Sequence, residues 1–230
     1  MMNFEKHFKA AVTVDNVIFG FDKEGLKVLL IKRGEEPFLD AWALPGYFML
    51  EKEDLDTAAQ RVLKQLTGLE DVYLEQVNSF GAVDRHPSGR VLTVAYYSLI
   101  KIKAYQFNPQ SDVSRFVKWV KLSEAKELAF DHYKILMACF QRLKRRLRTE
   151  PVGFELLPRK FTLSELQHLY EEILETKLDK RNFRKKIISM KLLVDLGETQ
   201  KAVAHRPAKL YKFDKAKYNE LKATGFNFEL

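Results

Sequence analysis

The chain has 230 residues, of which 46% are hydrophobic and 30% charged, and its formal net charge is +8. This composition excludes a disordered chain and allows one large core or two smaller ones. Cys139 stands alone, which excludes an intrachain disulfide and fits a reducing cytoplasm. No uncharged apolar run approaches the ~18 residues of a membrane span, and charges interrupt residues 1–21, so we expect neither a membrane anchor nor a signal peptide. The positive charge favours an anionic partner.

The first 150 residues alternate between strand-like and helix-like patterns. Apolar runs at 11–20 and 26–32 flank a turn at 22–25, and together they predict a β-hairpin. Apolar residues then recur at helical spacing over 54–67, with Asp54 or Asp56 available as the cap and a glycine at the end. Further strands are predicted at 74–80, 90–101 and 116–121, and a long amphipathic helix at 131–147.

The remaining residues, 151–230, have a different pattern that predicts a second domain. Thr162 and Glu165 have the spacing of a capping box that opens a helix. Asp179 can cap a second helix at 180–188, which is strongly basic, and strands are predicted at 191–196 and 209–213. We therefore expect domains at 1–150 and 151–230.

Part of the first domain resembles the Nudix family. The residues that carry the resemblance are 42–46 (WALPG) and the segment 58–69, in which Arg61 and Gly68 occupy their places in the Nudix box. Glu53 takes the first glutamate position of that box, whereas Tyr47 replaces its glycine. The resemblance implies an α/β (α+β) fold, namely a Nudix-like α/β/α sandwich with a mixed sheet.

The helix carboxylates of that box are absent. The family's chemistry implies three carboxylates at i, i+3 and i+4 that hold divalent cations, and here these positions are Val62, Gln65 and Leu66. Two apolar side chains and an amide predict no catalytic residues, no metal site and no cofactor. Four acidic residues close to the start of the helix leave a metal-binding role open, although their simpler role is to complement the positive end of the helix dipole. They are Glu51, Glu53, Asp54 and Asp56.

The segment 80–97 looks like the loop and strand that border the ligand cleft in Nudix-related regulators. Polar side chains beside paired tyrosines could bind the hydroxyls and the apolar face of a sugar. In the alternative interpretation, at least one of the tyrosines faces the core and the loop is a solvated turn. The candidate effector-binding residues are Tyr47, Phe80, Asp84, Arg85, Arg90, Tyr96 and Tyr97.

The basic helix and the following hairpin predict a DNA-binding surface. A basic helix that is anchored by an apolar stripe and preceded by another helix suits insertion into the major groove, and a hairpin suits contact with phosphates. The alternative is a small interaction module with a solvated basic face. The candidate DNA-binding residues are Lys180, Arg181, Asn182, Arg184, Lys185, Lys186, His205, Arg206 and Lys209.

Across nearly its whole length the chain resembles the Nudix-related transcriptional regulators, through 155–166, 178–185 and 206–211. The resemblance implies a small winged helix-turn-helix domain and a homodimer on a pseudo-palindromic double-stranded DNA operator. It also implies a small-molecule effector, a pentose such as L-arabinose or ADP-ribose, whose binding often lowers DNA affinity as in a repressor. Because the cation site for a diphosphate is lost, the sequence favours the sugar. A Nudix-type pyrophosphatase and a non-catalytic RNA-binding or protein-interaction module are the alternatives.

Overall fold

The computed structural model describes the chain except for residues 1–8, 105–106, 202–205 and 230. The chain divides into two compact units, which we treat separately. The sheet unit contains the residues up to Gly20 and Lys27–Phe140, and the wing unit contains Phe21–Leu26 and the residues from Gln141 onward. Among the described residues, each helix is too short or too polar to cross a membrane.

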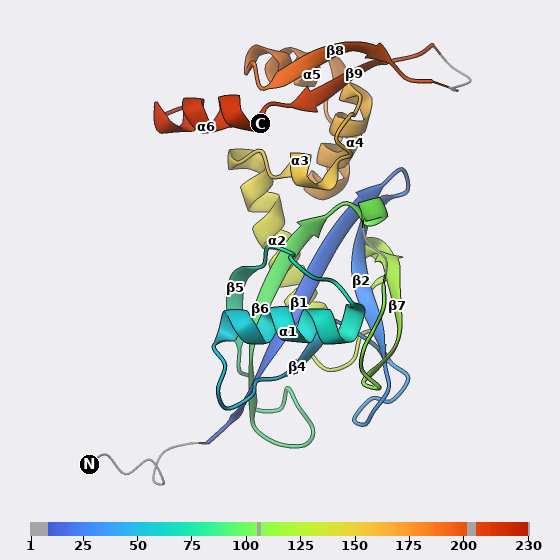
Figure 1. Cartoon of the computed structure of the whole chain (residues 1–230), viewed down its shortest axis with the longest axis vertical. Coiled ribbons are helices and arrows are strands. Elements are labelled where there is room, and N and C mark those ends of the chain that lie inside the picture. The colour runs from blue at the N-terminus through green and yellow to red at the C-terminus, as the bar shows by residue number, and fades with distance from the viewer. Residues whose placement is uncertain (1–8, 105–106, 202–205, 230) are drawn as a thin grey trace. The chain divides into compact units, whose positions relative to one another are not determined.

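A mixed sheet dominates the sheet unit (Figure 1). Its strand order is β3-β2-β1-β6-β5, with β4 paired to β1 and β7 paired to β2. The pair β1 and β6 is parallel, with Val14 opposite Val94. The pairs β1–β4, β2–β3, β2–β7 and β5–β6 are antiparallel. The strands are β1 (Ala11–Asp22), β2 (Gly25–Arg33), β3 (Trp42–Ala43), β4 (Gly46–Phe48), β5 (Glu75–Phe80), β6 (Val91–Ile100) and β7 (Ser114–Lys121).

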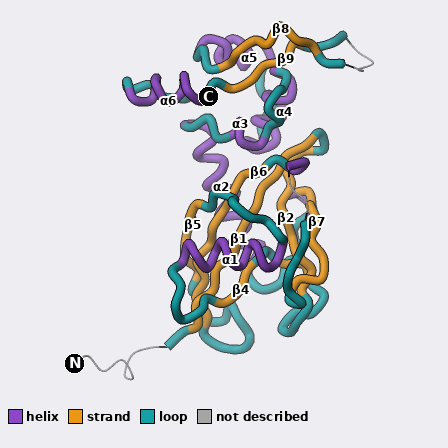
Figure 2. Tube along the Cα trace, viewed as in Figure 1, coloured by secondary structure: helices purple, strands orange, loops and turns teal. Residues whose placement is uncertain are grey.

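Helices cover both faces of this sheet. Successive side chains of β1 point to opposite faces, so neighbouring residues of this strand contact different helices. Ile18 packs with Leu63 of α1 (Leu55–Thr67), which crosses the strands in Figure 2. The next residue, Phe19, meets Phe140 of α2 (His132–Thr149) with the ring centroids 6.4 Å apart. Two 3₁₀ turns flank β7 in the sequence: η2 (Ile102–Ala104) precedes it and η3 (Leu122–Glu124) follows it. The predicted α/β/α sandwich is confirmed, although the short strands β3 and β4 were not foreseen.

The same alternation buries both tyrosines of β6. Tyr96 lies on the α1 side, where its hydroxyl donates a hydrogen bond of 2.6 Å to Asp56. Tyr97 lies on the other side, with its ring 6.4 Å from that of Phe19. Because both faces of the sheet are covered, neither ring is free to form a surface for a ligand.

The cap residues that the sequence predicted for α1 are in place. The Asp54 carboxylate accepts a hydrogen bond of 2.7 Å from the Thr57 N–H, which satisfies a free donor of the first turn. At the other end, Gly68 has a φ of 79°, and its N–H donates to the Lys64 carbonyl. A left-handed residue at this place favours glycine.

The wing unit is a helix-turn-helix followed by a hairpin. Both predicted caps are confirmed: Thr162 forms a capping box with Glu165, and Asp179 accepts a hydrogen bond from the Asn182 N–H at 2.8 Å. The short α3 and the final α6, which Asp214 caps, were not foreseen. The elements are α3 (Gly153–Leu156), α4 (Leu163–Leu174), α5 (Lys180–Ser189), β8 (Leu193–Thr199), β9 (Lys209–Phe213) and α6 (Lys215–Ala223).

Aromatic contacts hold the wing unit together. Tyr170 of α4 packs against Phe183 of α5, with the ring centroids 5.7 Å apart, and this contact joins the two helices. The tip of the β1–β2 hairpin also belongs to this unit, and its Phe21 lies 5.4 Å from the ring of His168 on α4. A second close approach lies nearby, because a Cβ on Gly25 would come within 2.7 Å of a Glu172 carboxylate oxygen. Two turns of α4 therefore contact the hairpin tip.

Candidate functional site

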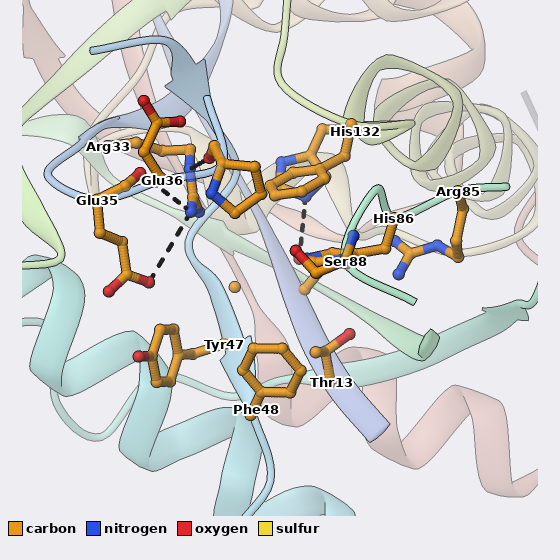
Figure 3. Close-up of a pocket in the computed structure, with 14 residues that line it drawn as sticks. Thr13, Arg33, Glu35, Glu36, Tyr47, Phe48, Arg85, His86, Ser88 and His132 are labelled. Atoms are coloured by element: carbon orange, nitrogen blue, oxygen red, sulfur yellow. Dashed lines mark hydrogen bonds and ion pairs between the residues drawn. The ribbon is translucent and has the colours of Figure 1, made fainter. Parts of the chain in front are cut away.

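A pocket of about 270 Å³ opens in the sheet unit. Its walls come from β1, the end of β2 and the loop after it, β4, the loop 81–90 and the first residues of α2. The rings of Tyr47 and Phe48 lie on one side, across from Arg33 and His132, as Figure 3 shows. Segments far apart in the sequence therefore meet at one end of the sheet.

Aromatic rings line much of the pocket. The ring of His86 stacks on that of Phe130, with centroids 4.9 Å apart and an interplanar angle of 15°. Phe48 meets His86 edge-on at 6.2 Å, and it also packs against Tyr47. The Arg33 guanidinium lies 4.9 Å from the centre of the Phe130 ring, which is a cation–π distance. Such walls suit the flat faces of a base or a sugar.

Charged side chains of both signs complete the lining. Arg33 donates to the Pro37 carbonyl at 2.8 Å, and one of its terminal nitrogens lies 3.8 Å from the Glu35 carboxylate. Burial raises the pKa of Tyr47, and the nearby Glu35 adds to this effect. Carboxylates such as Glu35 and Glu36 can accept hydrogen bonds from sugar hydroxyls, and a guanidinium can hold a phosphate.

A buried ionic network forms one wall of the pocket. The side chains of Asp15 and Arg85 are each only 4% exposed, and their charged atoms lie 3.6 Å apart. Arg85 also donates to the Asp131 carboxylate at 2.8 Å. Because two carboxylates already hold Arg85, this residue ties the loop 81–90 to the start of α2. Its charge is largely matched within the protein.

His132 is the other fixed member of this network. Its Nδ1 accepts a hydrogen bond of 3.0 Å from the Leu44 N–H, so the proton of the neutral ring is on Nε2, 3.4 Å from the Asp15 carboxylate. Burial lowers the pKa of His132, although Asp15 and Asp131 oppose the shift. Burial also lowers the pKa of His86, and Arg85 and Arg33 add to that effect. Both rings are therefore neutral near pH 7.

Two of the seven predicted effector residues, Tyr47 and Arg85, line this pocket. Asp84 is exposed on the same loop, and Phe80 is buried at the end of β5. Tyr96 and Tyr97 are buried on the two faces of the sheet, away from the pocket. The five that do not line the pocket are Phe80, Asp84, Arg90, Tyr96 and Tyr97.

Sequence reasoning missed Arg33, His86, Phe130 and His132 as lining residues. No local pattern marks them, because only the fold brings them together. Asp15 did carry a signal: a charged residue inside an apolar strand is rarely buried unless it has a partner.

Helix α1 has no place for the metal ions that the Nudix resemblance implies. Val62 and Leu66 are buried in the core between α1 and the sheet. Gln65 is exposed, and its amide oxygen accepts a hydrogen bond of 2.9 Å from Arg61. In the described part of the chain, no group of three or more His, Cys, Asp or Glu side chains gathers as a cation site. These residues do not fit a magnesium cluster.

The retained part of the box supports the pocket. Arg61 donates to the Glu53 carboxylate at 2.8 Å and to the Phe48 carbonyl at 2.9 Å. Glu53 also accepts a hydrogen bond from the Leu50 N–H, and the bond from Arg61 holds the pKa of Glu53 below its usual value. This glutamate–arginine pair therefore fixes the end of β4 and with it the aromatic side of the pocket.

The basic helix α5 presents a second candidate surface. Phe183 and Ile187 are buried beneath it, which leaves most of its polar side chains facing outward. Arg184 is an exception, because it is only partly exposed and donates to the Ser164 hydroxyl of α4 at 3.0 Å. The exposed candidates on α5 are Lys180, Arg181, Asn182, Lys185 and Lys186.

The hairpin after α5 carries the remaining DNA-binding candidates. Arg206 is exposed, and Lys209 is paired with Asp195 across the hairpin at 2.9 Å. His205 lies outside the described residues. The hairpin is antiparallel, with Val194 opposite Lys212, as a wing requires.

Each of the two units matches a known protein family. Residues 9–139 match the NUDIX domain, and residues 153–213 match the NrtR DNA-binding winged helix domain. The ADPR responsive transcriptional repressor NtrR of Acinetobacter baylyi is 40% identical over 221 residues, which cover 94% of this chain and 85% of the relative.

Solved structures agree with this assignment. Shewanella oneidensis NrtR complexed with a 27mer DNA is 33% identical with a TM-score of 0.76, and the match covers 94% of this chain and 97% of that one. The NUDIX domain of the same protein, complexed with ADP ribose, is 33% identical with a TM-score of 0.56 and matches 62% of this chain and 94% of that one. The chain therefore belongs to the NrtR family of transcriptional regulators and combines a Nudix domain with an NrtR DNA-binding winged helix domain.

Proposed function

We propose that this chain is a repressor that binds ADP-ribose in the pocket of its Nudix domain and then releases its DNA operator. We further propose that it acts as a homodimer on a pseudo-palindromic site and hydrolyses no nucleotide. The observation that carries the proposal is the division within the Nudix box: the glutamate–arginine pair that supports the pocket is kept, while Val62 and Leu66 fill the core where metal ligands would stand.

The pocket supports ADP-ribose as the effector. Its aromatic walls suit an adenine ring, its carboxylates can accept hydrogen bonds from ribose hydroxyls, and Arg33 can meet the diphosphate. The sequence favoured a pentose because the cation site was lost, but Arg33 lines the pocket and offers positive charge without a metal. The relatives support ADP-ribose and give the pentose no support.

The coupling between effector and operator is a difference in affinity. ADP-ribose would bind more tightly to a dimer geometry in which the two α5 helices no longer match the spacing of the operator. By linkage, operator DNA must then weaken ADP-ribose binding by the same factor. This reciprocity provides a test that does not depend on the structural details.

The first experiment is a titration with ADP-ribose. We expect calorimetry to show binding of ADP-ribose and no binding of L-arabinose, and we expect ADP-ribose to release the protein from a duplex selected out of a random pool. Phe48→Ala should weaken ADP-ribose binding, because it removes part of the aromatic wall. Tyr73→Ala, at a residue that is 77% exposed and outside the pocket, is the matched control and should leave binding unchanged.

Either of two results would contradict the effector assignment: arabinose binding without ADP-ribose binding, or equal effects of the two substitutions.

A hydrolysis assay separates the repressor from the alternative, a Nudix pyrophosphatase. With Mg²⁺ present, we expect ADP-ribose to remain intact, because the helix has no carboxylates at the positions of Val62, Gln65 and Leu66. Gln65→Glu should gain no activity, since a single exposed carboxylate does not make a cluster. Release of AMP and ribose phosphate by the unaltered protein would overturn this part of the proposal.

A further inference from the structure

An isoleucine lies on the exposed face of the basic helix α5. Ile188 is 52% exposed, whereas the adjacent Ile187 is only 2% exposed and anchors the helix. Ile188 follows Arg181 by seven residues and Lys185 by three, and both of these basic residues are exposed. Residues at such spacings share one face of an α-helix, so the three side chains form a single outward stripe.

We propose that Ile188 reads a thymine in the operator by contacting its C5-methyl group, an assignment that rests on the proposed DNA binding by α5. A stripe with two cations and one branched apolar side chain has charge that complements DNA, and the thymine methyl is the apolar group of the major groove. The cations meet phosphates or guanine edges, and the isoleucine meets the methyl group. The basic residues alone do not recognise this feature of the sequence.

The helix geometry also places the thymine. Seven residues of an α-helix rise about 10 Å, and successive base pairs are separated by about 3.4 Å. If α5 lies along the groove, Ile188 reads a base pair about three steps from the one nearest Arg181. The operator half-site therefore contains a thymine at this offset.

Uridine scanning tests the contact directly. Duplexes that bind the unaltered protein are selected from a random pool, and each thymine is replaced in turn by deoxyuridine, which lacks the C5-methyl group. At one position per half-site we expect affinity to fall about fourfold, which corresponds to one buried methyl group. In Ile188→Ala, replacement at that same position should change affinity by less than a factor of about 1.5, while replacements elsewhere behave as in the unaltered protein.

A matched substitution separates sequence readout from general loss of binding. Lys186 is another exposed DNA-binding candidate of the same helix, but it lies outside the stripe. Lys186→Ala should therefore lower affinity for all duplexes alike and leave the pattern of uridine sensitivity intact. Ile188→Val keeps a branched side chain and should retain part of the sensitivity. If no thymine is sensitive, or if the sensitivity persists in Ile188→Ala, the contact does not exist. If the unaltered protein selects no duplex at all, the proposed function itself fails.

Discussion

At the scale of single residues, His132 links the pocket to the stability of the fold. Its ring is neutral and buried, with one nitrogen bonded to the Leu44 N–H and the other near Asp15. Burial holds its pKa in the folded chain below the ordinary value of 6.5. The unfolded chain therefore takes up a proton on this ring at a higher pH than the folded chain does. The stability that the neutral ring provides is fully present above about pH 6.5 and is lost as the pH falls through the folded value.

This linkage predicts a pH dependence that one substitution should reduce. His132→Asn removes the titration but keeps an oxygen that can accept from Leu44. Urea unfolding at pH 7.5 and 5.5 should show a larger loss of unfolding free energy in the unaltered protein than in the variant, by up to about 1.4 kcal/mol per pH unit. Equal losses in the two proteins would contradict this account.

Residues of the pocket also show where sequence reasoning succeeds and where it stops. Arg85 could be found because it lies in a polar loop that resembles the loop bordering the ligand cleft in Nudix-related regulators. Phe130 and Arg33 could not, because they lie almost 100 residues apart in sequence and only the packing of β2 against the start of α2 makes them neighbours. Periodicity reports which side of an element faces inward, but not which ends of distant elements meet.

At the scale of elements, α5 should carry operator affinity on its outward face. Arg181→Ala with Lys185→Ala removes two exposed cations without disturbing Phe183 or Ile187. We expect strongly weakened operator binding, unchanged ADP-ribose binding, and a salt dependence whose slope falls by about 0.9 for each phosphate that the variant no longer neutralises. Binding assays at several salt concentrations measure this directly, and unchanged operator affinity would exclude this face.

Arg184 is best left unaltered in that experiment. Its hydrogen bond with Ser164 joins α5 to α4, so its removal would change the helix packing as well as any interaction with DNA.

Most helices and strands could be predicted from the sequence, and the helix starts are marked by capping residues that lie close to them in the chain. Asp54, Thr162 and Asp179 each have a side chain that accepts a hydrogen bond from a free N–H at a helix start, and such a bond reaches only three residues along the chain. The helix α6 has the same signal in Asp214 and could have been found. The strands β3 and β4 have two and three residues, too few for any alternating pattern, so only their pairing partners define them.

At the scale of the whole molecule, the chain does not divide into two consecutive pieces. The wing unit includes the second half of α2, where the fully buried Leu147 lies against Gly153. A Cβ on Gly153 would come within 2.9 Å of the Leu147 side chain. A fragment of residues 151–230 lacks this leucine, whereas a fragment of residues 141–230 keeps it. We expect urea unfolding to show that the shorter fragment is less stable by at least about 2 kcal/mol, the usual cost of losing a buried leucine. Equal stability would show that the end of α2 adds nothing.

The hairpin tip gives this division a consequence for protein engineering. Phe21 and Gly25 belong to the wing unit through their contacts with α4, yet they are joined to strands that line the pocket. A chimaera that swaps winged helices between two regulators at a single junction would pair the α4 of one parent with the hairpin tip of the other. To transfer operator specificity, residues 21–26 must therefore be exchanged together with the winged helix. A chimaera that combines the Nudix domain of one parent with the winged helix of another needs two exchanged segments rather than one.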